Sequence, residues 1–157
     1  MKIFPLTITF RTGILFLLLV CWICPDIWGQ EGLSIAPLFE KYGNCQNVTR
    51  VELNGSILKS HNMSMYKSLV FKDVRPYLKD ILQKLKYDKE HSGQIYKSQE
   101  VVENGVLLSA YYQLQTIKSK KRYILFKTGK ETPAATLIYI EGKLTEEELM
   151  DMLYRKK

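Results

Sequence analysis

The feature that most constrains the fold is a change of hydrophobic period near residue 94. Between residues 73 and 89, apolar side chains recur at three- and four-residue spacing, which indicates a helix. From residue 94 to 141 they alternate with polar side chains, and this two-residue period is typical of strands with one buried face. Asn104–Gly105 lies within this stretch, and both residue types accept the positive φ that a type I′ hairpin turn requires.

The alternating stretch divides into four predicted strands at 94–103, 106–115, 122–128 and 135–141. Because short turns separate them, consecutive strands are expected to pair antiparallel as a meander. The alternation places one set of side chains on a buried face: Val106, Leu108, Ala110, Tyr112 and Leu114, with Ile124, Phe126, Ile138 and Ile140 as expected partners.

Shorter elements flank the meander. The pattern predicts a helix at 35–42, strands at 48–53 and 65–71, and an ambiguous segment at 56–61. Thr145 and Glu148 form a capping box that begins a C-terminal helix, whose Leu149, Met150 and Leu153 are expected to face the sheet. We therefore expect one α+β domain over residues 30–157: two layers, an antiparallel β-meander with helices packed on one face.

The N-terminal segment has the pattern of a secretory signal peptide. Lys2 and Arg11 precede an apolar run at 14–24, and Gly29 lies at the junction with polar residues. The pattern predicts that residues 1–29 are removed by cleavage after Gly29.

Two alternatives remain for this segment. It can be retained as a membrane anchor, although residues 14–28 fall short of the roughly 20 apolar residues that span a bilayer, and Pro25 and Asp26 interrupt them. It can also be lipidated at Cys21 or Cys24, although each of these cysteines follows a bulky residue. Neither alternative makes the remaining domain membrane-spanning.

Cleavage would change the cysteine and charge balance. Cys45 would be the one remaining cysteine, so no disulfide can form within the mature chain and a hydrophobic core must stabilise the domain. Loss of Lys2, Arg11 and Asp26 reduces 23 basic and 16 acidic residues to 21 and 15, a net charge of +6. This charge favours anionic envelope surfaces or acidic partners rather than nucleic acid, or it is ordinary surface solvation.

Several segments resemble a known family. They are PLFEKYG at 37–43, VTRVEL at 48–53, SAYYQL at 109–114, RYILFK at 122–127 and ATLIYIEGKLTEEELMDML at 135–153. Together they resemble a family of short exported proteins of Bacteroidetes bacteria that is a domain of unknown function. The resemblance implies a periplasmic or cell-surface location and an α+β fold. It implies no activity and no functional residues.

The sequence contains no recognisable catalytic, metal or cofactor motif. Cys45 with His61 or His91 is the one thiol–imidazole combination, and no predicted element brings them together. The same three residues lack the short paired spacings of a zinc site. Carboxylates such as Glu52 and Glu100 lie on strands where nothing indicates a cleft. We expect no enzyme activity and no cofactor.

Two surfaces are candidates for partner binding. Tyr111, Tyr123 and Tyr139 are expected to be cross-strand neighbours on the outer face of the sheet, and tyrosine combines a large contact area with a polar end. Alternatively, the N-terminal part of the chain covers this face, or the three are ordinary cross-strand pairs. The second surface is a basic patch in the predicted turn at 118–121 and the residue after it, formed by Lys118, Lys120, Lys121 and Arg122. Alternatively, these residues are simply a solvated hairpin tip.

These observations favour an exported, non-enzymatic interaction module that binds a protein or glycan of the cell envelope, with the basic patch biasing it towards acidic partners. The first alternative is an envelope-acting hydrolase, which requires a pocket that holds Glu52, Glu100 and either His61 or His91. The second alternative is a periplasmic regulator of envelope signalling.

Overall fold

The computed structural model of the chain describes residues 32–154. The predicted signal peptide, its cleavage site after Gly29, and Cys21 and Cys24 lie outside the described residues. Within residues 32–154, no helix is both long enough and apolar enough to cross a membrane.

The elements follow the predicted order along the chain. They are α2 (Ala36–Gly43), β1 (Val48–Glu52), α3 (Ser56–Ser60), β2 (Met63–Phe71), α4 (Arg75–His91), β3 (Ile95–Glu103), β4 (Val106–Ile117), β5 (Lys120–Thr128), β6 (Ala135–Gly142) and α5 (Glu146–Tyr154). The ambiguous segment at 56–61 forms the short helix α3.

Two hairpins of the meander turn on two residues each. Asn104 and Gly105 have φ of 51° and 77°, which confirms the predicted hairpin turn between β3 and β4. Lys118 and Ser119 have φ of 48° and 63°, so the same kind of turn joins β4 to β5. The predicted four-residue turn at 118–121 is therefore too long, and β5 begins at Lys120.

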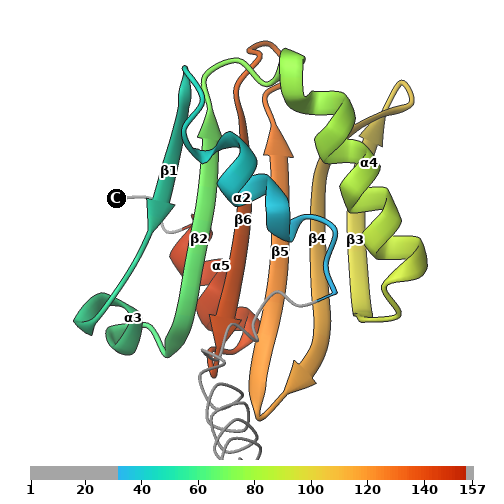
Figure 1. Ribbon diagram of the computed structural model, residues 1–157. Helices are drawn as coiled ribbons and strands as arrows, with labels where there is room; N and C mark the ends of the chain where they lie inside the picture. Colours follow the sequence, from blue (N-terminus) through green and yellow to red (C-terminus); the bar gives the residue numbers. More distant parts are fainter. Residues whose placement is uncertain (1–31, 155–157) are drawn as a thin grey trace, which may run out of the picture.

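The six strands form one antiparallel sheet in the order β1-β2-β6-β5-β4-β3 (Figure 1). The last four positions are the predicted meander, and β2 adds to the free side of β6 with Leu69 opposite Leu137. The α+β class and the antiparallel meander are thus confirmed. Because β2 covers its outer edge, β6 is a central strand and is buried along most of its length.

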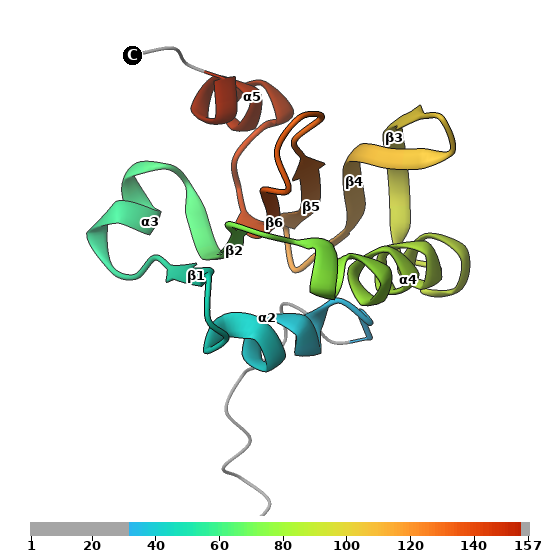
Figure 2. The same cartoon turned by 90° about the horizontal axis from the view of Figure 1, so that it is seen from above.

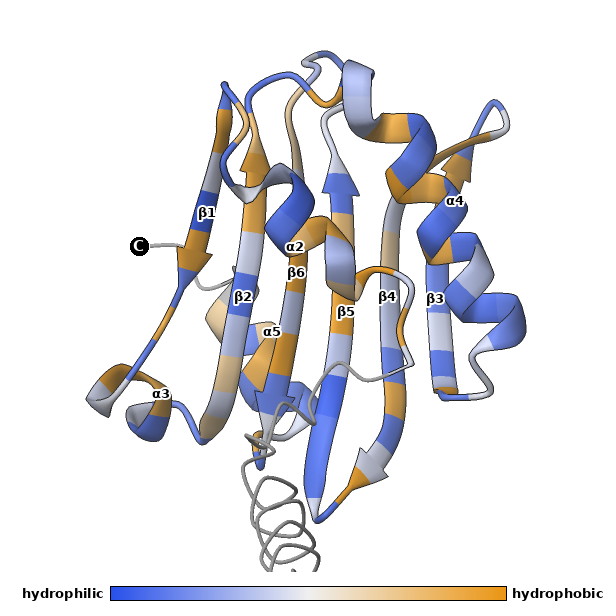
Figure 3. Ribbon diagram, viewed as in Figure 1, coloured by the Kyte–Doolittle hydropathy of each residue, from blue (hydrophilic) through white to orange (hydrophobic). Residues whose placement is uncertain are grey.

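Helices α2 and α4 pack on one face of the sheet, called here the α2/α4 face (Figure 2). Apolar residues alternate along the strands beneath them (Figure 3). Burial of each such side chain stabilises the fold by about 1.5–3 kcal/mol. The main core contains Leu38, Phe39 and Tyr42 from α2, Ile81 and Leu85 from α4, and Leu69, Phe71, Tyr112, Ile124, Phe126 and Leu137 from the strands.

Helix α5 is the exception to the expected layering, because it lies on the opposite face, called here the α5 face (Figure 2). Leu144 and Leu149 pack there against Met63, Tyr123 and Ile140. The side chain of Leu153 lies outside the described part of the chain. The strands also present apolar side chains on this face, and the amphipathic α5 buries part of them.

The capping box of α5 is confirmed by two hydrogen bonds. The Thr145 backbone N–H donates to Glu148 Oε2 at 2.6 Å, and the Glu148 N–H donates to Thr145 Oγ1 at 3.1 Å. The Thr145 N–H is the main cause that lowers the pKa of Glu148 below its usual value.

The predicted facing of β6 is wrong by one residue. Leu137 and Tyr139 lie on the α2/α4 face, opposite Phe126 and Ile124, whereas Ile138 and Ile140 lie on the α5 face. The sequence of β6, ATLIYIEG, is apolar at nearly every position, so alternation does not identify its inner face.

A buried carboxylate connects the two helices of the α2/α4 face. Asp88 of α4 is fully buried and accepts hydrogen bonds from the backbone N–H groups of Ser34 (2.6 Å) and Ile35 (3.0 Å). The Ser34 hydroxyl also donates to the carbonyl oxygen of Lys84 at 2.9 Å. Ile35 is the N-cap residue of α2 and offers no capping side chain, so Asp88 supplies the negative charge that a helix N-terminus favours.

We expect Asp88→Asn to lower the free energy of unfolding by about 1–3 kcal/mol, because the amide can accept only one of the two N–H bonds and turns a donor towards the other. Urea denaturation measures this change. The control is Glu90→Gln, which alters an exposed carboxylate two residues away and should change the free energy by less than about 0.5 kcal/mol. Equal urea midpoints for Asp88→Asn and the wild type would contradict this role.

Candidate binding face

The three tyrosines of the predicted partner face do not share one surface. Tyr139 is fully buried on the α2/α4 face, where its hydroxyl donates to Glu141 Oε2 at 3.3 Å. Tyr111 and Tyr123 lie on the α5 face with ring centroids 6.0 Å apart. The predicted stripe is therefore wrong for Tyr139, and the cause is the one-residue error in the facing of β6.

Tyr123 is on the predicted face but is not accessible. Helix α5 and the residue before its capping box cover it completely, and its hydroxyl donates to the Leu144 carbonyl oxygen at 3.4 Å. Tyr111 is half-buried. It is the one tyrosine of the predicted three that lies at the border of an open surface.

That surface is a hollow on the α5 face, beyond the part that α5 covers. Helix α5 lies behind the lower half of β2 and β6 in Figure 1, and the upper half is left without a helix. The hollow measures about 380 Å³. We call it the open hollow and define it by six side chains from four strands: Val70, Ser109, Leu125, Lys127, Thr136 and Ile138.

The open hollow combines aliphatic and polar groups. Leu125 and Ile138 are cross-strand partners at its lower side, and Val70 of β2, which is 39% exposed, lies opposite Thr136. Lys127 lies one row higher, directly between Ser109 of β4 and Thr136 of β6. Lys127 is the only charged residue among those that line the hollow.

A smaller hollow of about 220 Å³ adjoins the open hollow and shares Ser109 and Leu125 with it. It lies against α5, and Tyr111, Glu146 and Met150 also line it. The Tyr111 hydroxyl is buried without a hydrogen-bond partner, and burial, with a smaller effect from the nearby Glu146 carboxylate, raises its pKa. Glu146 is close enough to act on this pKa but not in hydrogen-bond geometry, and it accepts instead from Lys97 Nζ at 2.8 Å.

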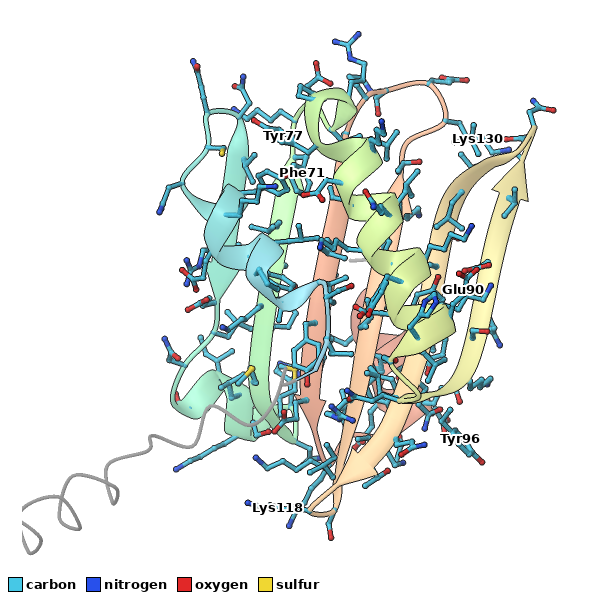
Figure 4. The ribbon with its side chains drawn as sticks, turned by 45° about the vertical axis from the view of Figure 1, so that its right-hand side comes forward. Phe71, Tyr77, Glu90, Tyr96, Lys118 and Lys130 are labelled. Atoms are coloured by element: carbon cyan, nitrogen blue, oxygen red, sulfur yellow. The ribbon has the colours of Figure 1, made fainter. Side chains whose placement is uncertain are left out.

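The predicted basic patch is divided by the structure. Lys118 lies at the tip of the β4–β5 hairpin (Figure 4), and Lys120 pairs with Glu141 at 2.9 Å, while Lys121 is half-buried. Arg122 is only 1% exposed. It cannot be part of a surface patch, because β5 already begins at Lys120 and its alternation turns Arg122 inward.

Arg122 has a structural role. Its guanidinium donates to the carbonyl oxygen of Gln115 from Nε (3.1 Å) and Nη2 (3.0 Å), and to Gln94 Oε1 from Nη1 (2.9 Å). These bonds link the end of β4 and the residue that precedes β3 to β5.

The carboxylates of the hydrolase alternative lie at opposite edges of the sheet. Glu52 is on the edge strand β1 and binds Arg50. Glu100 is on the other edge strand, β3, and binds Lys89 at 2.6 Å and the Tyr112 hydroxyl. Burial alone would raise the pKa of Glu100, but these two hydrogen bonds outweigh it and lower the pKa.

The remaining candidates for chemistry are also dispersed. His91 ends α4 and stacks on Tyr87 with centroids 4.7 Å apart, and His61 follows α3 near the other edge of the sheet. Cys45 donates weakly to the Lys41 carbonyl oxygen at 3.7 Å. Among residues 32–154, no cluster of three or more histidines, cysteines or carboxylates could hold a metal ion.

Tyr111 and Tyr112 are neighbours with opposite environments, which gives a matched pair of variants. Tyr112→Phe should lower the free energy of unfolding by about 1.5–3 kcal/mol, because it removes a hydrogen bond to the charged Glu100. Tyr111→Phe removes a buried hydroxyl without a partner, so stability should stay equal or rise by up to about 1 kcal/mol. Urea denaturation of both variants measures the difference. A loss in Tyr111→Phe as large as that in Tyr112→Phe would show that the Tyr111 hydroxyl is satisfied.

Comparison with solved structures finds the crystal structure of PA94, a protein of unknown function from Pseudomonas aeruginosa. It is 13% identical, the alignment covers 84% of this chain and 83% of PA94, and the TM-score is 0.32. This likeness is too low to support an inference. No curated protein matches the chain. A model described as a family of unknown function (DUF6108) matches residues 23–153, which include all the strands of the sheet, and the chain therefore belongs to the DUF6108 family.

Proposed function

We propose that this protein is an exported, non-enzymatic interaction module that binds a protein or glycan of a bacterial cell envelope in the open hollow. The observation that supports binding is the hollow itself. It is a concave, partly aliphatic surface on a sheet whose other face packs against α2 and α4. A periplasmic regulator of envelope signalling would be one form of such a module.

The composition of the open hollow suits a protein interface. Interfaces combine an apolar centre with a polar rim. Here Val70, Leu125 and Ile138 supply the apolar part, and Lys127 and Thr136 the polar part. Tyr111 at the border adds an aromatic side chain of the kind that interfaces favour, so this residue of the predicted partner face keeps its proposed role.

Export is supported by the apolar run at 14–24 and its positively charged flank. We expect the protein expressed in a Bacteroidetes host to appear in the periplasmic or cell-surface fraction and to begin at Gln30. Cell fractionation followed by N-terminal sequencing measures both. A chain that keeps Met1 in the membrane fraction would favour the retained anchor, and an acylated Cys21 or Cys24 would favour the lipoprotein.

The binding test uses the tagged mature chain, residues 30–157, to capture partners from native envelope extract. Val70→Glu places a charge in the open hollow at an exposed position, so it should leave the fold intact and reduce capture of the retained partner about tenfold or more. Mass spectrometry with quantitation of the partner measures the change.

The matched control is Val102→Glu, the same substitution at a more exposed valine of the edge strand β3, outside the hollow. Capture should stay at the wild-type level. Circular dichroism establishes that both variants are folded. If Val70→Glu and Val102→Glu retain the partner equally, the open hollow is not the binding site.

A further inference from the structure

We propose that the partner held in the open hollow is an extended protein segment with a carboxylate between two aliphatic side chains, and that the carboxylate binds the ammonium group of Lys127. This inference rests on the proposed function and names the chemistry of the partner. It is carried by the place of Lys127 within an otherwise uncharged lining.

Lys127 differs from the other strand lysines on the α5 face because it has no anionic neighbour. There Lys97 pairs with Glu146, and the charge of Lys121 contributes to the lowered pKa of Glu148. No ion pair involves Lys127 within the described residues, whereas Lys120 of the same strand faces the other side of the sheet and pairs with Glu141. A partner that excludes water from the hollow would strengthen the attraction of this ammonium for a carboxylate.

The neighbours of Lys127 are hydroxyl groups. Ser109 and Thr136 lie directly opposite it on β4 and β6, so their side chains are about 5 Å away across the strands. A carboxylate has two oxygens that accept several hydrogen bonds, and a flanking hydroxyl can donate to the oxygen that the ammonium does not bind. The three side chains together form a row of donors suited to one carboxylate.

The aliphatic side chains favour a protein segment over a glycan. Val70, Leu125 and Ile138 offer no hydrogen bond, so sugar hydroxyls placed against them would lose water without replacement. In an extended segment, residues i and i+2 point to the same side. A sequence of aliphatic, any, acidic, any, aliphatic would therefore present two aliphatic side chains and a carboxylate to the hollow at once.

The probes that test this inference are two synthetic pentapeptides with blocked ends, Leu-Ser-Glu-Ser-Leu and Leu-Ser-Lys-Ser-Leu. Each is titrated at millimolar concentration into ¹⁵N-labelled protein, residues 30–157, and followed by the amide signals of Leu125, Lys127 and Ile138. The glutamate peptide should bind roughly three- to tenfold more tightly than the lysine peptide, because attraction replaces repulsion at one charge.

Reversal of the charge at Lys127 gives the decisive variant. Lys127→Glu should reverse the preference, so that the lysine peptide binds more tightly than the glutamate peptide. The matched control is Lys79→Glu, which makes the same change of net charge on the exposed side of α4, across the sheet, and should keep the wild-type preference. Dispersed amide spectra of both variants establish that they are folded.

Two results would overturn this inference. One is the absence of a preference for the glutamate peptide in the wild type, including no binding of either peptide. The other is the same preference before and after Lys127→Glu. The proposed function is judged separately: if envelope capture is lost in Val70→Glu but kept in Lys127→Glu, the hollow binds its partner without charge recognition. Capture of a glycan in the hollow would also contradict the protein segment proposed here.

Discussion

The arrangement of the molecule depends on the buried carboxylate of Asp88 and the N-terminus of α2. By accepting the N–H groups of Ser34 and Ile35, this carboxylate holds α2 beside α4, and the two helices together cover one face of the sheet. Helix α5 can then bury its apolar side only on the other face. Its nine residues span about 14 Å, whereas a nine-residue strand such as β5 spans about 30 Å, so α5 covers only part of that face and leaves the open hollow.

The elements that could be predicted from sequence are those with a local signal. The turn at Asn104–Gly105 depends on two adjacent residues, the capping box on Thr145 and Glu148, and the meander on a two-residue period with short turns. The placement of β2 beside β6 has no local signal, because these strands are separated by α4 and three strands of the sheet. No pattern in the sequence therefore brings Val70 close to Ile138.

The incorrect part of the predicted site has one physical cause in β6 and another in β5. In β6, apolar residues occupy both faces because helices pack on both sides of the sheet, so nothing in the sequence shows that Tyr139 points away from Tyr111. In β5, the charge of Arg122 suggested a solvated turn. Its guanidinium is instead buried, because the Gln115 carbonyl oxygen and the Gln94 side-chain oxygen accept hydrogen bonds from it.

The alternation of side chains along β5 and β6 also explains which residues line the open hollow. In β5, burial of Ile124 and Phe126 in the main core requires Leu125 and Lys127 to face the other side. In β6, burial of Leu137 turns Thr136 and Ile138 to that side as well. A sheet face that is exposed only to water needs no aliphatic side chains at these positions. A face that packs only against a helix needs no lysine between two hydroxyl groups. The mixture is understandable if the face receives a partner that is itself both aliphatic and acidic.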